Sequence, residues 1–236
     1  MWLFKSEIAF ARTGLLEGFR EYHCHLLPGV DDGVKKMEDT LAILTQWESL
    51  GVQEVWFTPH VMEDIPNTPE DLQKRFGEVL EAYKGSIRLH LAAENMLDNL
   101  FPERLEKREL LPLLDNHLLV ETSYFNPPLR MAETMEEIKK AGYRPVLAHP
   151  ERYRYMDMAD YRKWKARGVM FQLNFPSLVG AYGPEVQHKA QSLLKRGMYD
   201  LAGSDTHSPG FVNYYLAGKL PRKSVELLEP LFAVSI

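Results

Sequence analysis

One arrangement of apolar and polar positions recurs along the chain: an amphipathic stretch, a glycine, and a short apolar run. It occurs as ESLGVQEVWFTPH, AYKGSIRLHLAAE, KKAGYRPVLAHPE, KARGVMFQLNFP and LKRGMYDLAGSDTH. The amphipathic stretches place apolar residues three and four positions apart, which is helical spacing. Examples are Met37, Leu41 and Leu44; Met131, Met135 and Ile138; and Val186, Ala190 and Leu193. The runs after the glycines are rich in Val, Leu, Phe and Tyr and end at polar residues or Pro, as strands do.

The glycines at these junctions have a predicted role of their own. They are Gly51, Gly85, Gly142, Gly168 and Gly197. A glycine just past a helix suits the left-handed conformation that closes the helix, which other residues adopt only at a steric cost. We therefore expect all five to end helices in this way.

Two further runs, EYHCHLL and DNHLLVETS, bring the predicted strands to seven. The strands are expected near residues 21–26, 54–59, 87–93, 118–122, 145–148, 169–174 and 199–203. Helical patterns separate most of them, which predicts β-α units and a parallel sheet. Seven such units in 236 residues are close to a barrel, and no linker divides the chain. A doubly wound open sheet is the alternative, but the glycine-rich phosphate loop expected after its first strand is absent.

Composition narrows the class of protein. The hydrophobic share of 45%, with 11 Phe, 11 Tyr and 4 Trp, indicates a folded core and excludes disorder. A formal net charge of −5 argues against a nucleic-acid surface. The single cysteine, Cys24, excludes a disulfide framework and a Cys-rich zinc module, so we expect a cytoplasmic protein. No apolar run approaches the ~20 residues of a membrane helix, so no membrane span is expected.

Histidines and carboxylates gather at the ends of the predicted strands. The residues are His23, His25, His60, His149 and His207, with Glu94, Glu121 and Asp205. In a barrel the C-terminal strand ends meet at one rim, so these side chains are expected to lie together. Mixed His and carboxylate ligation suits Mn, Zn, Fe or Mg rather than a metal that prefers thiolates. So many ligands on one rim predict more than one divalent ion.

Several other residues have a structural interpretation. His90 lies inside the third predicted strand, His117 in a turn and His188 on a helix. His23 and His25, two residues apart on a strand, point to one side, so Cys24 points to the other and is expected to be a small buried residue.

The motifs HCHLLPGVDDG, TPH, LAAEN, VETS, AHPERY and GSDTH, in this order, resemble the polymerase-and-histidinol-phosphatase (PHP) superfamily. The LPGxDDG continuation is similar to the bacterial manganese-dependent protein-tyrosine phosphatases of capsular and exopolysaccharide operons. The resemblance runs from about residue 20 to residue 215. It implies a distorted (β/α)7 TIM-like barrel over residues 20–236, preceded by an N-terminal extension of residues 1–19.

The resemblance also implies a cluster of three divalent ions, with Mn favoured over Fe, Zn or Mg. Carried over position by position, the metal ligands would be His23, His25, Asp32, His60, Glu94, Glu121, His149, Asp205 and His207. Asp32 is taken rather than Asp31 because the second Asp of DDG matches the ligand position of the family. Arg152 in HPERY matches an arginine that family members place near the phosphate.

Three departures from the family pattern concern residues around this site. Glu21 stands where the family usually has Asp. The segment VMEDIPNTP after TPH lacks the basic residues of some Gram-positive relatives, and SPGFVNYY lacks their further arginine. The last two bear on the phosphate clamp and not on the metal site.

The predicted metal site and the resemblance together imply hydrolysis of phosphotyrosine on proteins by attack of a metal-bound hydroxide, with Arg152 and the metals binding the phosphoryl oxygens. The sixth residue after Cys24 is Val30, so the Cys-x5-Arg loop of thiol-dependent tyrosine phosphatases is absent. The expected partner is a phosphotyrosine protein such as a bacterial tyrosine kinase. Two alternatives stay open: a small-molecule phosphatase acting on histidinol phosphate, and a metal-binding module without turnover. The oligomeric state is open as well.

Overall fold

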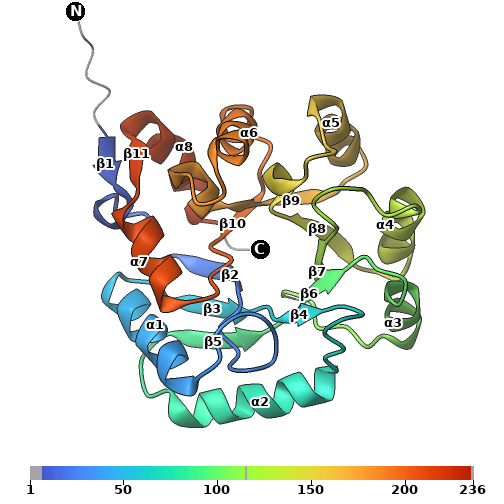
Figure 1. Cartoon of the computed structure of the whole chain (residues 1–236), viewed down its shortest axis with the longest axis horizontal. Helices are drawn as coiled ribbons and strands as arrows, with labels where there is room; N and C mark the ends of the chain where they lie inside the picture. The colour runs from blue at the N-terminus through green and yellow to red at the C-terminus, as the bar shows by residue number, and fades with distance from the viewer. Residues whose placement is uncertain (1–6, 115, 235–236) are drawn as a thin grey trace, which may run out of the picture.

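Two curled parallel sheets form the centre of the fold, and the helices lie around them (Figure 1). The structure, a computed structural model, describes residues 7–114 and 116–234. The smaller sheet has the strand order β2-β3-β5, and the larger has the order β10-β9-β8-β7-β6-β4. Their strands are β2 (Arg20–Cys24), β3 (Glu54–Phe57), β4 (His60–Val61), β5 (Arg88–Leu91), β6 (Glu94–Met96), β7 (His117–Glu121), β8 (Arg144–Ala148), β9 (Met170–Asn174) and β10 (Leu201–Gly203).

The helices follow the strands in the predicted alternation. They are α1 (Met37–Ser49), α2 (Pro69–Ala82), α3 (Phe101–Lys107), α4 (Met131–Lys140), α5 (Met158–Ala166), α6 (Pro184–Lys195), α7 (Pro209–Ala217) and α8 (Arg222–Phe232). Short 3-10 turns are η1 (Phe10–Arg12), η2 (Pro150–Arg152) and η3 (Phe175–Val179). Side chains of Thr68, Asp157 and Ser208 accept hydrogen bonds from the first turns of α2, α5 and α7, which satisfies amides that lack a helical partner.

Each of the seven predicted strands has a counterpart, but two of them break. The predicted strand 54–59 ends at Phe57, and the chain resumes as β4 in the other sheet. Pro59 has no N–H to continue the ladder. The predicted strand 87–93 likewise ends at Leu91, because the amide of Ala93 donates to Leu111 O at 2.9 Å. The predicted strand is therefore too long at its end, and Glu94 begins the separate strand β6.

Four of the five junction glycines adopt the predicted left-handed conformation. Their φ angles are +89° at Gly51, +97° at Gly142, +76° at Gly168 and +61° at Gly197. Gly85 does not, because α2 ends through an extended Tyr83. A Cβ at Gly85 would lie 2.2 Å from Tyr83 Oη, so close approach explains this glycine.

Backbone hydrogen bonds join the two sheets beside β2. The amide of His25 donates to Thr206 O at 2.9 Å, and the amide of Asp205 donates to His23 O at 2.8 Å. The segment that follows β10 therefore lies along the end of β2. This pairing brings the first and last predicted ligand motifs together.

Residues 7–19 pack onto the same core as the rest of the chain. Strand β1 (Glu7–Ala9) pairs antiparallel with β11 (Lys219–Pro221), and the buried Phe10 stacks on Phe175 with 4.9 Å between ring centroids. Residues 1–6 of the predicted extension lie outside the described residues, and the division at residue 20 stays a prediction. Within residues 7–114 and 116–234, no helix is both long and apolar enough to cross a membrane.

Candidate metal centre

The C-terminal ends of the parallel strands bring the predicted ligands into one cluster. Among the described residues, three groups of side chains offer ligand atoms that all lie within 4.8 Å of one another. The groups are His25, Asp32, His60 and His207; His23, His25, Glu94 and Asp205; and His60, Glu94 and Glu121. His25, His60 and Glu94 each belong to two groups, so the three groups form one continuous site.

Glu94 lies at the centre of this cluster and is fully buried. Its Oε2 atom lies 3.1 Å from His60 Nδ1, 3.2 Å from His23 Nε2 and 3.3 Å from His25 Nε2. Its Oε1 atom lies 2.9 Å from His149 Nε2. Glu94 therefore connects His149, which is outside the three groups, to the rest of the site.

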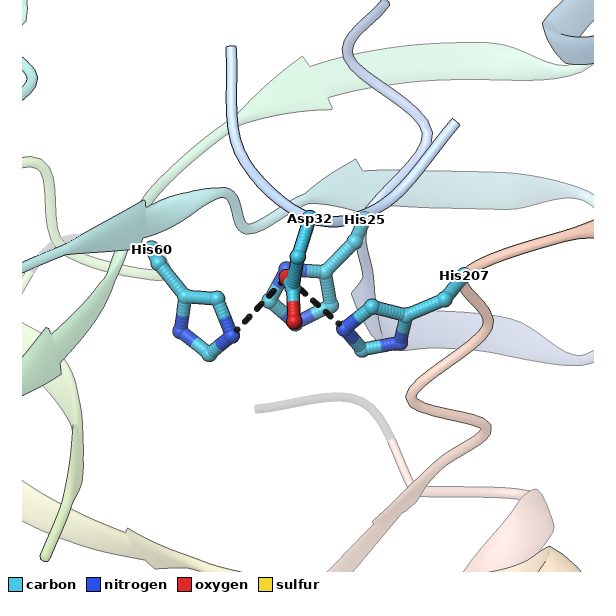
Figure 2. Close-up of side chains that lie close together, drawn as sticks. All are labelled: His25, Asp32, His60 and His207. Carbon is cyan, nitrogen blue, oxygen red and sulfur yellow. Dashed lines mark ion pairs between the residues drawn. The ribbon is translucent and has the colours of Figure 1, made fainter. Parts of the chain in front are cut away.

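Asp32 lies on the solvent-exposed side of the cluster. Its Oδ1 atom lies 3.5 Å from His60 Nε2 and 3.4 Å from His207 Nε2. Figure 2 shows the carboxylate between these two imidazoles, which approach it from opposite sides. The Asp32 side chain is 66% exposed, whereas that of His25 is fully buried. The cluster is thus open to solvent beside Asp32.

The neighbouring Asp31 has a different place. It is buried, and its Oδ2 atom lies 2.8 Å from His25 Nδ1 and accepts a hydrogen bond from the His60 amide at 3.0 Å. Asp31 therefore stands behind the imidazole of His25, while Asp32 faces the cluster. This geometry supports the choice of Asp32 as the ligand of the pair, and that choice stays a prediction.

Several buried atoms in the cluster have close neighbours but no hydrogen bond. His60 Nδ1 lies 3.0 Å from Glu121 Oε1 and 3.1 Å from Glu94 Oε2, yet none of the three atoms has a hydrogen-bond partner among the described residues. Buried polar atoms are almost always hydrogen-bonded. A bound cation would satisfy these three atoms, because their lone pairs point to a common place and no hydrogen atom lies between them. Imidazole nitrogen and carboxylate oxygen are both suitable ligands for divalent metals.

The electrostatics of the cluster also favour positive charge. Burial lowers the pKa of His60, but nearby Glu121 and Glu94 outweigh this and raise it to about 10. Burial raises the pKa of Glu94 and of Asp205, but the surrounding histidines outweigh it and hold both pKa values well below the usual range. Both carboxylates therefore stay ionised although they are buried. They require positive charge, which divalent cations supply.

Two predicted ligands have strained backbone. His149 has φ +34° and Asp205 has φ +52°, in the left-handed region that non-glycine residues seldom adopt. Hydrogen bonds hold both residues: the amide of Asp205 donates to His23 O, and His149 O accepts from the Arg152 amide at 2.9 Å. Such strain is typical of functional sites, where surrounding structure enforces it.

A layer of polar side chains behind the cluster went unrecognised in the sequence. Gln172 Oε1 lies 2.6 Å from His23 Nδ1, and Asn174 Nδ2 donates to Asp205 Oδ2 at 3.2 Å. Both residues are buried on β9. A signal was present, since polar residues alternate with Phe171 and Leu173 in a strand expected to be buried. Such partners orient metal-ligating side chains.

Arg152 lies directly beside the cluster. Its guanidinium forms an ion pair with Asp205 Oδ2 and is sandwiched between the rings of Tyr124, at 4.5 Å, and Tyr182, at 4.2 Å. Asp205 Oδ1 faces inward, 3.2 Å from His25 Nε2. Arg152 therefore orients Asp205 in this structure, and its predicted contact with phosphate stays a prediction.

The remaining histidines lie outside the cluster. His90 stacks on Trp56 at 4.4 Å and lies 3.1 Å from Glu54. His188 is exposed on α6. The prediction that His117 lies in a turn is wrong: it begins β7, and its backbone pairs with Leu113. The extended backbone there follows from the ladder with Arg144 of β8.

Cys24 has the buried position that the sequence predicts. Its side chain is fully buried, and its thiol donates to Trp56 O at 3.3 Å. Burial raises the pKa of the thiol well above its ordinary value. Since a thiolate and not a thiol is the nucleophile, Cys24 is unsuited to covalent catalysis.

The fold and the cluster define an α/β protein with a candidate metal-binding centre at its strand ends. This chain belongs to the family described as capsular polysaccharide synthesis, CpsB/CapC, whose sequence pattern matches residues 19–212.

Curated relatives carry tyrosine phosphatase names. The tyrosine-protein phosphatase YwqE of Bacillus subtilis is 25% identical over 202 residues, covering 83% of this chain and 80% of the relative. The tyrosine-protein phosphatase CpsB of Streptococcus pneumoniae is 28% identical over 202 residues, covering 80% and 82%.

Solved structures show the same fold. A chain from the crystal structures of YwqE and CpsB, described as metal-dependent tyrosine phosphatases, has a TM-score of 0.76 and 23% identity, covering 91% of this chain and 88% of its own. A zinc-bound amidohydrolase from Burkhoderia ambifaria has a TM-score of 0.51 and 13% identity, covering 99% and 86%.

Proposed function

We propose that this chain is a metal-dependent protein-tyrosine phosphatase. The observation that carries the proposal is the buried cluster around Glu94, whose histidine and carboxylate atoms converge without hydrogen bonds. Membership of the CpsB/CapC family and the names of the curated relatives support the same activity.

We further propose that the cluster holds three divalent ions, with Mn favoured over Fe, Zn or Mg. The three overlapping groups of ligand atoms support this number, since each offers at least three donors. The proposed ligands are His23, His25, Asp32, His60, Glu94, Glu121, His149, Asp205 and His207. Glu94 belongs to two of the groups, and its negative charge would offset the repulsion between neighbouring cations.

The chemistry assigns separate tasks to the residues of this chain. Divalent cations supply Lewis acidity, which activates water and neutralises charge on phosphoryl oxygens. Asp31 and Gln172 orient the imidazoles of His25 and His23. Arg152 donates one N–H to Asp205. Because a guanidinium has five donors in a fixed plane, other N–H groups of Arg152 can donate to a phosphoryl oxygen. No side-chain nucleophile is needed, since tyrosinate, with a conjugate-acid pKa of about 10, is a comparatively good leaving group.

The physiological setting forms part of the proposal. We propose a phosphotyrosine protein as substrate, such as a bacterial tyrosine kinase linked to capsular or exopolysaccharide synthesis, and a cytoplasmic location. The family description supports the polysaccharide link. The single, buried cysteine supports a reducing compartment.

We also propose that the two sheets form one PHP-type barrel of seven β/α units. In this interpretation β3 with β4, and β5 with β6, are each one strand that breaks midway. The bonds between β2 and the segment after β10 would then close the ring.

A metal-depletion experiment tests the proposal. Chelation should abolish hydrolysis of a phosphotyrosine peptide, and added Mn should restore it. The Cys24→Ser variant should keep its turnover within a few-fold of the wild type. Turnover that survives chelation would contradict the proposal, and so would a Cys24→Ser variant with full metal content and little activity.

A further inference from the structure

A basic pocket adjoins the metal cluster on the side of Arg152. Its volume is about 270 Å³. The lining includes Arg152, Arg154, Tyr182, Lys189 and the first turn of α6. Arg152 belongs to both places, because it lines the pocket and pairs with Asp205 of the cluster. A peptide with one residue at the metals would therefore place its neighbours close to the pocket.

Arg154 is the exposed cation of this pocket. The buried Tyr153 separates it from Arg152, which ends the 3-10 turn η2, and both arginines line the pocket. The Arg154 guanidinium stacks on Phe125, with 4.9 Å to the ring centroid. Within residues 7–114 and 116–234 no carboxylate forms an ion pair with Arg154, whereas Arg104 pairs with Asp98 at 2.9 Å. Arg154 is thus held by an aromatic ring while its charge is not neutralised.

The other charged groups around the pocket leave it positive. Lys189 lines the pocket, and its Nζ donates a hydrogen bond to Tyr153 O at 2.9 Å. This bond holds the positive charge of Lys189 beside Arg154. Glu151 also lines the pocket, but it is buried and its carboxylate is engaged, since it accepts from Ser177 Oγ at 2.9 Å and from Tyr199 Oη at 3.0 Å. The exposed Glu185 is the carboxylate that remains, at the first turn of α6.

The loop after β7 carries exposed apolar side chains, and one of them, Phe125, contacts Arg154. Phe125 is 61% exposed and Leu129 is fully exposed. The loop is fastened to the Arg154 segment by the hydrogen bond from the Arg154 amide to Tyr124 O at 2.8 Å. It begins just after Glu121, a member of the cluster. Exposed apolar side chains joined to a positive pocket fit an extended, acidic peptide.

We propose that the pocket binds the carboxylate of an Asp or Glu that lies within three residues of the phosphotyrosine in the substrate. Arg154 is the residue that determines this specificity. The inference rests on the proposed phosphatase function. Arg152 and Arg154 line one pocket of about 270 Å³, and three extended peptide residues, which span ~10 Å, are enough to reach from one arginine to the other.

Kinetics on matched phosphotyrosine peptides test this proposal. One set carries a Glu at a single position within three residues of the phosphotyrosine, and the reference peptide carries Ala there. The wild-type enzyme should hydrolyse the best Glu peptide with a kcat/KM about two- to fivefold above the Ala peptide, mainly through KM, as expected for a partly exposed ion pair. Arg154→Glu should reverse the preference, and Arg154→Lys should retain it.

Arg162→Glu is the matched control, because Arg162 is exposed on α5 outside the pocket and the change in net charge is the same. It should leave the ratio of the two kcat/KM values unchanged. Equal loss on both peptides in Arg154→Glu, or no preference in the wild type, would overturn the specificity role. Failure to hydrolyse any phosphotyrosine peptide or p-nitrophenyl phosphate would instead overturn the proposed function.

Discussion

At the scale of single residues, Asp31 shows how a side chain outside the cluster controls it. Burial opposes ionisation of this carboxyl, but the His25 imidazole and the hydrogen bond from the His60 amide outweigh burial and lower its pKa. The charged carboxylate therefore fixes the orientation of His25. Asp31→Asn keeps the size of the side chain and removes the charge. We expect metal affinity to fall about ten- to a hundredfold, as for other partners of metal-ligating histidines.

Isothermal titration of the depleted protein with Mn measures this loss. Asp64→Asn, at an exposed position, provides the control and should bind metal like the wild type. Circular dichroism checks that the Asp31→Asn protein is folded. Unchanged affinity in a folded Asp31→Asn protein would mean that His25 needs no support from this carboxylate.

His149 and His90 form a second contrast between residues. His149 is buried and lies 2.9 Å from Glu94, whereas His90 is bound to Glu54 and Trp56 away from the cluster. We expect His149→Ala to lower bound metal and nearly abolish turnover, and His90→Ala to change neither. Elemental analysis of both purified variants measures the metal. An equal fall in stoichiometry for His90→Ala would remove the basis for assigning Glu94 and His149 to the centre.

At the scale of elements, the N-terminal ends of β2, β3 and β5 share a row of charges. Arg20, Glu54 and Arg88 are aligned by the strand register, and Glu54 Oε1 accepts from Arg20 Nε at 2.9 Å and from Arg88. Burial raises the pKa of Glu54, but the bonds from Arg88 and Arg20 outweigh it and lower the pKa below its usual value. The smaller sheet is therefore stabilised by the ionised form of Glu54.

The lowered pKa of Glu54 determines how the stability of the protein changes with pH. Stability from Glu54 is present above the unfolded-state pKa of about 4.3 and is lost as pH falls through the lower folded-state value. Glu54→Gln should lower the free energy of unfolding by about 1 kcal/mol at pH 7, and the difference should shrink toward pH 4. Urea denaturation at both pH values measures it, with Glu226→Gln on the exposed face of α8 as control. A difference that grows on acidification would contradict this account of Glu54.

The sequence predicts elements where apolar periodicity is local and misses features that depend on distant partners. Pro59 marks the end of the first run locally, whereas nothing local marks the break after Leu91, where the amide of Ala93 bonds to the distant Leu111. The residues of the cluster were recognisable because each lies in a short motif at a strand end. Gln172 and Tyr182 were not, because only the folded chain brings them to His23 and Arg152.

At the scale of the whole molecule, the fold is shared at low sequence identity. The chain has a TM-score of 0.76 with a structure of only 23% identity. In this chain the strand ends hold the predicted ligands from distant segments together. The net charge of −5 and the ionised carboxylates of the cluster both favour divalent cations.

The central claim, that this chain is a metal-dependent phosphatase for protein phosphotyrosine, is tested most directly by substrate competition. The measurement is kcat/KM of one Mn-loaded preparation on a phosphotyrosine peptide, the matching phosphoserine peptide and histidinol phosphate. We predict a preference for the phosphotyrosine peptide of about tenfold or more over both others, equivalent to about 1.4 kcal/mol or more in transition-state binding. Faster hydrolysis of histidinol phosphate, or no hydrolysis of any of the three by fully metal-loaded protein, would contradict the claim.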